Sequence, residues 1–145
     1  MKTDLFQLAP EFERDSLWLA DWPLCQLRVQ NDTNYPWFIL IPRRSAMVEI
    51  IDLTEQDRAQ LWHESAVLSA FLKSEFQAKK LNIAALGNMV PQLHLHHIVR
   101  YENDIAWPAP VWGKVQAKAY SESQWLELKQ KLQLLPSPHD GSVLN

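Results

Sequence analysis

The chain lacks a second cysteine, a recognisable signal peptide and a long apolar run. Cys25 is the only cysteine in 145 residues, which excludes an internal disulfide and a thiolate zinc cluster. No apolar run approaches the roughly 18 residues of a membrane span. Residues 1–6, MKTDLF, do not have the basic start and long apolar segment of a signal peptide. These absences predict a cytoplasmic protein with no membrane partner.

An excess of basic residues is also missing. The chain has 14 basic and 17 acidic residues and a net charge of −3. A non-specific grip on DNA or RNA needs a basic face, so a nucleic acid polymer is not an expected partner, whereas a small anionic ligand is still allowed. Apolar residues make up 47% of the chain, enough for a substantial core. We expect one domain over residues 1–135 and a flexible tail over 136–145.

The periodicity of apolar residues predicts an α+β fold. Residues 24–30 alternate between apolar and polar side chains, and 37–41 are a continuous apolar run, so they should pair as an antiparallel hairpin. Thr54 is a suitable N-cap for a long helix to about Lys79, and residues 121–124 resemble a capping box. Further strands are expected near 17–19, 81–86 and 90–100, with a short helix in 3–15. The result is a five-stranded antiparallel sheet with a long helix and a C-terminal helix.

The most informative run is VPQLHLHHIVR at 90–100, which contains three of the five histidines. Its polar and apolar residues alternate as in a half-buried strand. In a strand, Gln92, His94 and His96 would share one face, and His97 would point to the other. Two imidazoles and an amide on one face are costly to bury without partners. This pattern therefore predicts a cleft for a polar ligand.

The run GNMVPQLHLH at 87–96 resembles the signature of the histidine triad (HIT) family, His-φ-His-φ-His-φ-φ after Gly-Gln-Ser/Thr-Val. ILIPR at 39–43 is similar to the family's strand that ends in Ile-Pro-Lys, and Trp107-Pro108 to a Trp-Pro stretch after the motif. The resemblance covers roughly residues 15–112. It implies a homodimer with a nucleotide-binding cleft. The implied activity is that of a nucleotidyl hydrolase or transferase, and no metal or cofactor is expected.

The resemblance also assigns roles to residues. Aligned on Val90-Pro91, His94 is the middle histidine, which attacks the α-phosphate and forms a nucleotidyl-imidazole intermediate. A neutral imidazole is a competent nucleophile near pH 7 because its unperturbed pKa is about 6.5. His96 would donate a hydrogen bond to a phosphate oxygen, and Gln92 takes the first triad position. The expected substrate-binding residues are Asn31, Asp32, Asn82 and Asn88.

Three positions depart from the family pattern. Gln92 replaces the first histidine and cannot titrate, Met89 replaces a hydroxyl residue, and Ser45 lies where a histidine often follows Ile-Pro-Lys. These changes leave two other functions open. One is a nucleotide-binding module with little or no catalysis. The other, suggested by the His-x-His spacing on a strand, is a metal site formed by His94 and His96 with a third ligand that is His63 or a carboxylate.

Overall fold

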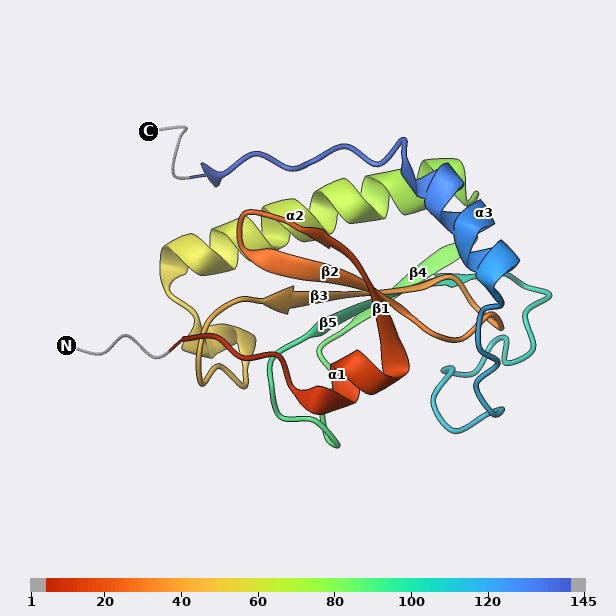
Figure 1. Cartoon of the computed structure of the whole chain (residues 1–145), viewed down its shortest axis with the longest axis horizontal. Helices are drawn as coiled ribbons and strands as arrows, with labels where there is room; N and C mark the ends of the chain where they lie inside the picture. The colour runs from red at the N-terminus through yellow and green to blue at the C-terminus, as the bar shows by residue number, and fades with distance from the viewer. Residues whose placement is uncertain (1–4, 142–145) are drawn as a thin grey trace.

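The computed structural model describes residues 5–141 and contains one five-stranded antiparallel sheet in the order β1-β2-β3-β5-β4 (Figure 1). Its strands are β1 (Ser16–Asp21), β2 (Cys25–Gln30), β3 (Trp37–Pro42), β4 (Lys80–Ala84) and β5 (Leu95–Arg100). The helices are α1 (Pro10–Asp15), η1 (Ile50–Asp52), α2 (Glu55–Glu75) and α3 (Glu122–Leu132). The predicted α+β fold is thus confirmed, with the long helix between the third and fourth strands.

The predicted hairpin is formed by β2 and β3, which pair antiparallel from Cys25–Pro42 to Val29–Phe38. One expectation for β2 is wrong: Arg28, placed on a half-exposed face, is only 4% exposed. Its guanidinium donates to the hydroxyl and the carbonyl of Ser16, at 2.7 and 3.0 Å. The sequence pattern of β2 alone could not show this contact, because Ser16 reaches Arg28 through the pairing of β1 with β2.

Helix α2 covers the other face of the sheet. The Thr54 side chain accepts a hydrogen bond from the Asp57 amide, as an N-cap should. The predicted stripe is buried, and it comprises Leu61, Ser65, Leu68, Leu72 and Phe76. The helix ends at Glu75, earlier than the predicted Lys79. Gln77 has a φ of 50°, in the left-handed region, and this turn ends the helix and leads the chain into β4.

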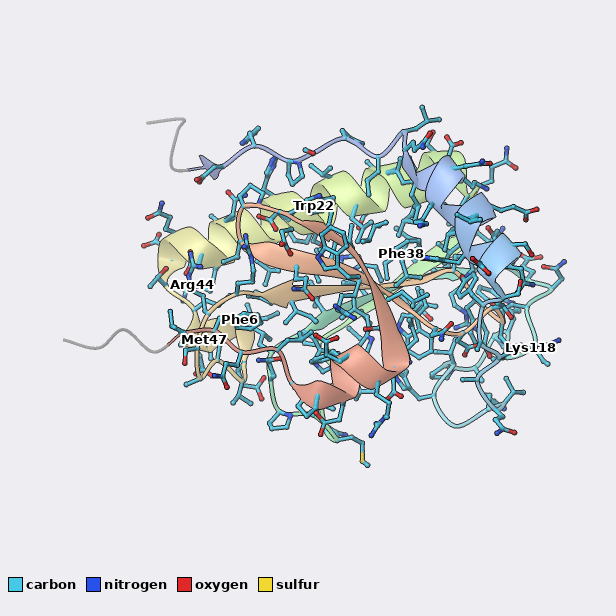
Figure 2. All side chains as sticks on the ribbon, in the orientation of Figure 1. Phe6, Trp22, Phe38, Arg44, Met47 and Lys118 are labelled. Atoms are coloured by element: carbon cyan, nitrogen blue, oxygen red, sulfur yellow. The ribbon has the colours of Figure 1, made fainter. Side chains whose placement is uncertain are left out.

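A hydrophobic cluster between the sheet and α2 includes Trp22 and Phe38, which Figure 2 labels. A buried carboxylate at one end of this cluster connects α2 to β2. Glu64 is fully buried and accepts hydrogen bonds from the amides of Leu24 and Cys25, at 2.8 and 2.9 Å. Because main-chain amides and a side-chain amide satisfy its oxygens, the buried carboxylate fixes where β2 begins relative to the helix.

The opposite face of the sheet carries a second cluster, which includes Phe12 of α1 and the β3 residues Trp37 and Ile39. The short helix expected within 3–15 is confirmed, and it runs from Pro10 to Asp15. Proline suits the first helical position and keeps the preceding residue extended, as Ala9 is with ψ of 138°. Residues 5–9 are not helical, and residues 3 and 4 lie outside the described residues.

The C-terminal helix begins as predicted, since Ser121 and Gln124 form a capping box at α3. Of the predicted tail, residues 136–141 run back along α2 (Figure 1), where the Gln60 side chain bonds the His139 carbonyl and the Gly141 amide. Residues 142–145 lie outside the described residues. Within 5–141, none of the helices has the length and apolar character needed to cross a membrane.

Candidate functional site

The histidine motif extends beyond the strand in which it was expected. Strand β5 begins at Leu95, so His96 and His97 belong to the sheet ladder, whereas Gln92 and His94 lie in the preceding loop. The rings of His94 and His96 nevertheless meet edge to face, with centroids 4.7 Å apart. The His94 ring also packs against Phe12, at 4.8 Å. The predicted pair of imidazoles is therefore present, with one member on a strand and one on a loop.

The hydrogen bonds of His94 determine which of its nitrogens is available. Nδ1 lies 2.7 Å from the main-chain carbonyl of Gln92. A carbonyl only accepts, so Nδ1 carries the proton and Nε2 keeps its lone pair in the neutral ring. Burial lowers the pKa of His94 from its ordinary value. The ring is thus neutral at pH 7, with the tautomer that a nucleophilic Nε2 requires.

His96 uses both nitrogens inside the protein. The indole N–H of Trp37 donates to Nδ1 at 2.9 Å, so Nε2 carries the proton and donates to the carbonyl of Leu86 at 3.1 Å. Burial, with the neighbouring His94 as a second cause, lowers the pKa of His96 to about 4. His96 is therefore a neutral hydrogen-bond donor that contacts a main-chain carbonyl in this structure.

These two rings line a cleft of about 470 Å³ on the face of the sheet opposite α2. The volume is in the range of pockets that bind small molecules. Its walls combine aromatic and aliphatic side chains with a few polar groups. The lining residues are Glu11, Phe12, Asp15, Gln30, Trp37, Ile39, Leu86, Gly87, Asn88, Met89, Val90, His94, His96 and Trp112.

A smaller hollow of about 70 Å³ adjoins the cleft at Gly87, Asn88 and His94. It is lined by main-chain and polar groups of the loop before β5 and by Val48 and Glu49. Gly87 lies close to the nucleophile candidate, because a Cβ there would be 3.1 Å from His94 Cε1 and 2.8 Å from the Val90 carbonyl oxygen. The absence of a side chain at Gly87 therefore permits the position of the His94 ring.

Gln92 lines the smaller hollow with His94, but it does not line the larger cleft with the two histidines. Its side-chain oxygen accepts from the Ala9 amide at 2.9 Å, and its side-chain nitrogen donates to the Gln7 carbonyl at 2.8 Å. The amide thus binds the N-terminal segment, while the main-chain carbonyl of the same residue binds His94. The expected common face for Gln92, His94 and His96 requires a continuous strand, which the chain forms only from Leu95.

Of the four predicted substrate-binding residues, only Asn88 lines the cleft. Asn31 accepts from the Tyr120 amide, and Asp32 accepts from the amides of Asn34 and Lys118. The side-chain oxygen of Asn82, Oδ1, accepts from the guanidinium of the buried Arg100. These three residues thus fix loops and a buried arginine through hydrogen bonds within the protein.

Several residues that line the cleft were missed by sequence reasoning, among them Gln30, Trp112, Glu11 and Asp15. Gln30 had one usable signal, because it ends a strand whose polar face was recognised. The other three come from α1 and from the segment after β5, and no local pattern indicates that these segments meet at the histidines.

The remaining histidines lie away from the cleft. His97 is fully buried on the α2 side, and burial lowers its pKa to about 4. Its Nδ1 donates to the Leu95 carbonyl at 3.1 Å, so its Nε2 accepts from the Ser65 hydroxyl at 2.7 Å. His63 of α2 stacks on His139, with centroids 3.9 Å apart. Within residues 5–141, no three histidine, cysteine or carboxylate side chains gather as a metal-binding group. His63 is therefore not placed to complete a metal site with His94 and His96.

Together, the sheet and the paired imidazoles define a histidine triad type of protein, and the comparisons agree. The family model described as HIT domain matches residues 11–103. A histidine triad protein from Marinobacter aquaeolei VT8 is 47% identical, with a TM-score of 0.89 over 91% of this chain and 96% of that one. A histidine triad protein from Bradyrhizobium japonicum is 43% identical, with a TM-score of 0.88 over 91% and 98% of the two chains.

A third solved structure, a histidine triad protein from Sinorhizobium meliloti 1021, is 40% identical, with a TM-score of 0.87 over 90% of this chain and 97% of that chain. The comparison with curated proteins gives no match. The chain belongs to the histidine triad (HIT) family.

Proposed function

We propose that the chain is a nucleotidyl hydrolase or transferase that acts at the α-phosphate of a nucleotide conjugate, with His94 as the nucleophile. The observation that carries the proposal is the state of His94 at the cleft. Its Nδ1–H is donated to the Gln92 carbonyl, so in the neutral ring Nε2 is the nitrogen that carries the lone pair. A neutral imidazole in this state attacks phosphorus without first losing a proton.

The proposed reaction has two displacements. The Nε2 lone pair forms a bond to the α-phosphorus, the bond from phosphorus to the leaving group breaks, and the leaving group takes that electron pair and then a proton from solvent. Water next attacks the same phosphorus and releases its proton to solvent, and the P–N bond returns its electron pair to Nε2. The net products are a nucleoside monophosphate and the protonated leaving group. In a transferase reaction, an alcohol or amine acceptor replaces water.

The surroundings of His94 supply positioning and hydrogen bonds, which are the main requirements of phosphoryl transfer. We assign His96 as the donor to a non-bridging oxygen. An anionic oxygen is a stronger acceptor than a carbonyl, so Nε2–H would exchange the Leu86 carbonyl for the phosphate. The Gln92 carbonyl keeps the Nδ1 proton in place and stabilises the positive charge on the ring after attack.

The nucleoside would occupy the larger cleft, whose aromatic walls are Phe12, Trp37 and Trp112. Asn88 is the predicted amide that lies at the cleft itself. We assign indirect roles to the others. Asn31 and Asp32 fix the chain directly after Gln30, which lines the cleft, and Asn82 orients the buried Arg100 next to β5.

The test is His94→Ala, with His139→Ala as a matched control because His139 is an exposed imidazole on the tail. Wild type and control should cleave a nucleoside phosphoramidate or a dinucleoside polyphosphate, and rapid quenching should trap a nucleotidyl-protein adduct visible by intact mass. His94→Ala should form no adduct and lose activity by about 10³-fold or more. Equal cleavage by wild type and His94→Ala would reject the proposal.

The second candidate is a nucleotide-binding module with little or no catalysis. It is favoured by the hydrogen bonds of His96 and Gln92, whose polar side-chain atoms are all engaged within the protein. Met89 also supplies no hydroxyl beside the leaving group. Calorimetry with AMP and GMP separates the candidates: binding to wild type without turnover of any conjugate supports the module, and no binding rejects it.

We also infer a cytoplasmic homodimer. The dimer is supported by family membership and by two tryptophans at the surface, Trp18 and Trp62, which are 54% and 70% exposed. Tryptophan is enriched at protein interfaces. Sedimentation equilibrium of the full chain tests it, and a monomer at micromolar concentration would contradict it.

A further inference from the structure

The N-terminal segment, residues 5–15, forms part of the wall of the cleft. Phe6, Leu8 and Ala9 pack on the hydrophobic cluster opposite α2, and Phe12 of the same segment is buried in it. The Phe12 ring meets the His94 ring edge to face at 4.8 Å. The position of this segment therefore affects both the shape of the cleft and the surroundings of the nucleophile.

Little within the segment itself fixes its position. Helix α1 has only six residues, far fewer than an isolated helix needs to be stable in water. Its N-cap residue, Ala9, has no side chain that can accept a hydrogen bond from the first turn. Contacts from other parts of the chain must therefore determine where α1 lies.

Gln92 provides such a contact from 83 residues away. Its amide oxygen accepts from the Ala9 N–H at 2.9 Å, and its amide nitrogen donates to the Gln7 carbonyl at 2.8 Å. A side-chain amide presents one acceptor and one donor at its end, so both groups of the extended backbone are satisfied. The main-chain carbonyl of Gln92 meanwhile accepts from His94 Nδ1 at 2.7 Å.

We propose that Gln92 is a positioning residue that couples the N-terminal segment to His94. Its side chain sets the position of residues 7–9 and thereby of Phe12, and its main chain sets the tautomer of the nucleophile. The inference rests on the proposed function for its consequences in substrate binding, although the coupling itself is a property of the free protein. Gln92 thus acts through Phe12 and His94 and does not contact the reacting phosphate.

The experiment compares Gln92→Ala with Gln130→Ala, a matched change at an exposed glutamine of α3. In the free protein, Gln92→Ala should abolish exchange protection of the Ala9 amide. It should also move the His94 Cε1–H resonance in the direction seen for Phe12→Leu, because the Phe12 ring shifts that resonance. Gln130→Ala should change neither signal. These readouts require folded protein only and need no substrate.

With a nucleoside phosphoramidate as substrate, Gln92→Ala should raise KM about tenfold, the size expected for one or two neutral hydrogen bonds. Its kcat should change little, since the main-chain carbonyl that orients His94 is kept. Gln92→Glu, which retains the acceptor for Ala9 but loses the donor to Gln7, should lie between Gln92→Ala and wild type in both exchange and KM.

Two results would overturn the inference. One is an unchanged Ala9 exchange rate and His94 resonance in Gln92→Ala. The other is a large fall in kcat at constant KM, which would indicate that the amide contacts the reacting group. Failure of the proposed function is distinct: wild type would then form no adduct and show no turnover, while the exchange and resonance data still decide whether Gln92 couples the segment to His94.

Discussion

Two adjacent histidines of β5 have the same low pKa and opposite surroundings. Burial lowers the pKa of both His96 and His97 to about 4. His97 is sealed against α2 and bonded to Ser65, whereas His96 lines a cleft of about 470 Å³ and bonds Trp37. A perturbed pKa by itself therefore does not identify a functional histidine, because the burial that lowers it occurs in a packed core and beside a cleft alike.

The two faces of the sheet also differ in how they are packed. The α2 face is filled by a cluster that includes Leu27, Leu68 and Leu72, all fully buried. The opposite face keeps an open volume because α1 is short and the loop before β5 carries a glycine at position 87. Loops on a rigid scaffold commonly carry reactive residues. His94 fits this arrangement, since it lies one residue before the ladder of β5.

The largest effect that tests this comparison is expected on the cleft face, for Gly87→Ala. The new Cβ would lie 2.8 Å from the Val90 carbonyl oxygen and 3.1 Å from His94 Cε1, so the loop and the ring must move. Small displacements of a nucleophile reduce rates strongly, and we expect kcat to fall about 100-fold. Steady-state kinetics with a nucleoside phosphoramidate measures it.

The matched control is Gly141→Ala on the tail. Its Cβ would lie 2.9 Å from the Gln60 side-chain oxygen, so Gln60 must shift at a place that does not line the cleft. This variant should keep the wild-type kcat even where its unfolding temperature falls, because Gln60 does not line the cleft. A Gly87→Ala protein that is fully active would mean that the loop before β5 does not position His94, so the cleft face would not differ from the α2 face in its effect on catalysis.

The placement of the histidines on the two faces of the sheet could be predicted from the sequence where it depends on local periodicity. The alternation of residues 90–100 separates His96 from His97, and it does so correctly because side chains of a strand alternate between faces. The same alternation wrongly predicts that Gln92 shares a face with His94 and His96, because the paired strand begins only at Leu95. Where a strand begins depends on its pairing partner: β3 pairs with β5 no further than Leu40–Leu95.

The rest of the site could not be predicted because it depends on contacts between distant segments. The bond from Gln92 to Ala9 joins residues 83 positions apart, and no local pattern in either segment indicates it. Trp112 reaches the cleft from the irregular chain after β5, where its indole meets the His96 ring at 5.2 Å. Such contacts are set by tertiary packing, which single-sequence patterns do not encode.

A smaller effect, confined to stability, is expected on the α2 face for His97→Leu. The change leaves the buried Ser65 hydroxyl without its partner, at a cost of about 2 kcal/mol in the free energy of unfolding. Urea unfolding measures this cost, and kcat should be unchanged. Adding Ser65→Ala should recover part of the loss, because replacing both partners removes the unpaired group. A fall in kcat similar to that of Gly87→Ala would contradict the expectation that the α2 face affects stability and not catalysis.

The last effect is absent at neutral pH and appears only as the pH falls: it is the pH dependence of stability, and it isolates His97. Its folded pKa of about 4 lies below the unfolded value of about 6.5, so in this interval the unfolded chain binds a proton that the folded chain does not. The contribution of the neutral imidazole to the free energy of unfolding is therefore fully present above pH 6.5. It is lost as the pH falls toward 4, by up to about 1.4 kcal/mol per pH unit for each such group.

The double variant His97→Leu with Ser65→Ala removes the contribution of His97 but keeps that of His96. The free energy of unfolding is measured in urea between pH 4.5 and 7.5. As the pH falls, it should decrease less steeply in the double variant than in wild type, by up to about 1.4 kcal/mol per pH unit. Equal slopes would show that His97 is not the neutral, sealed imidazole that distinguishes the α2 face from the cleft.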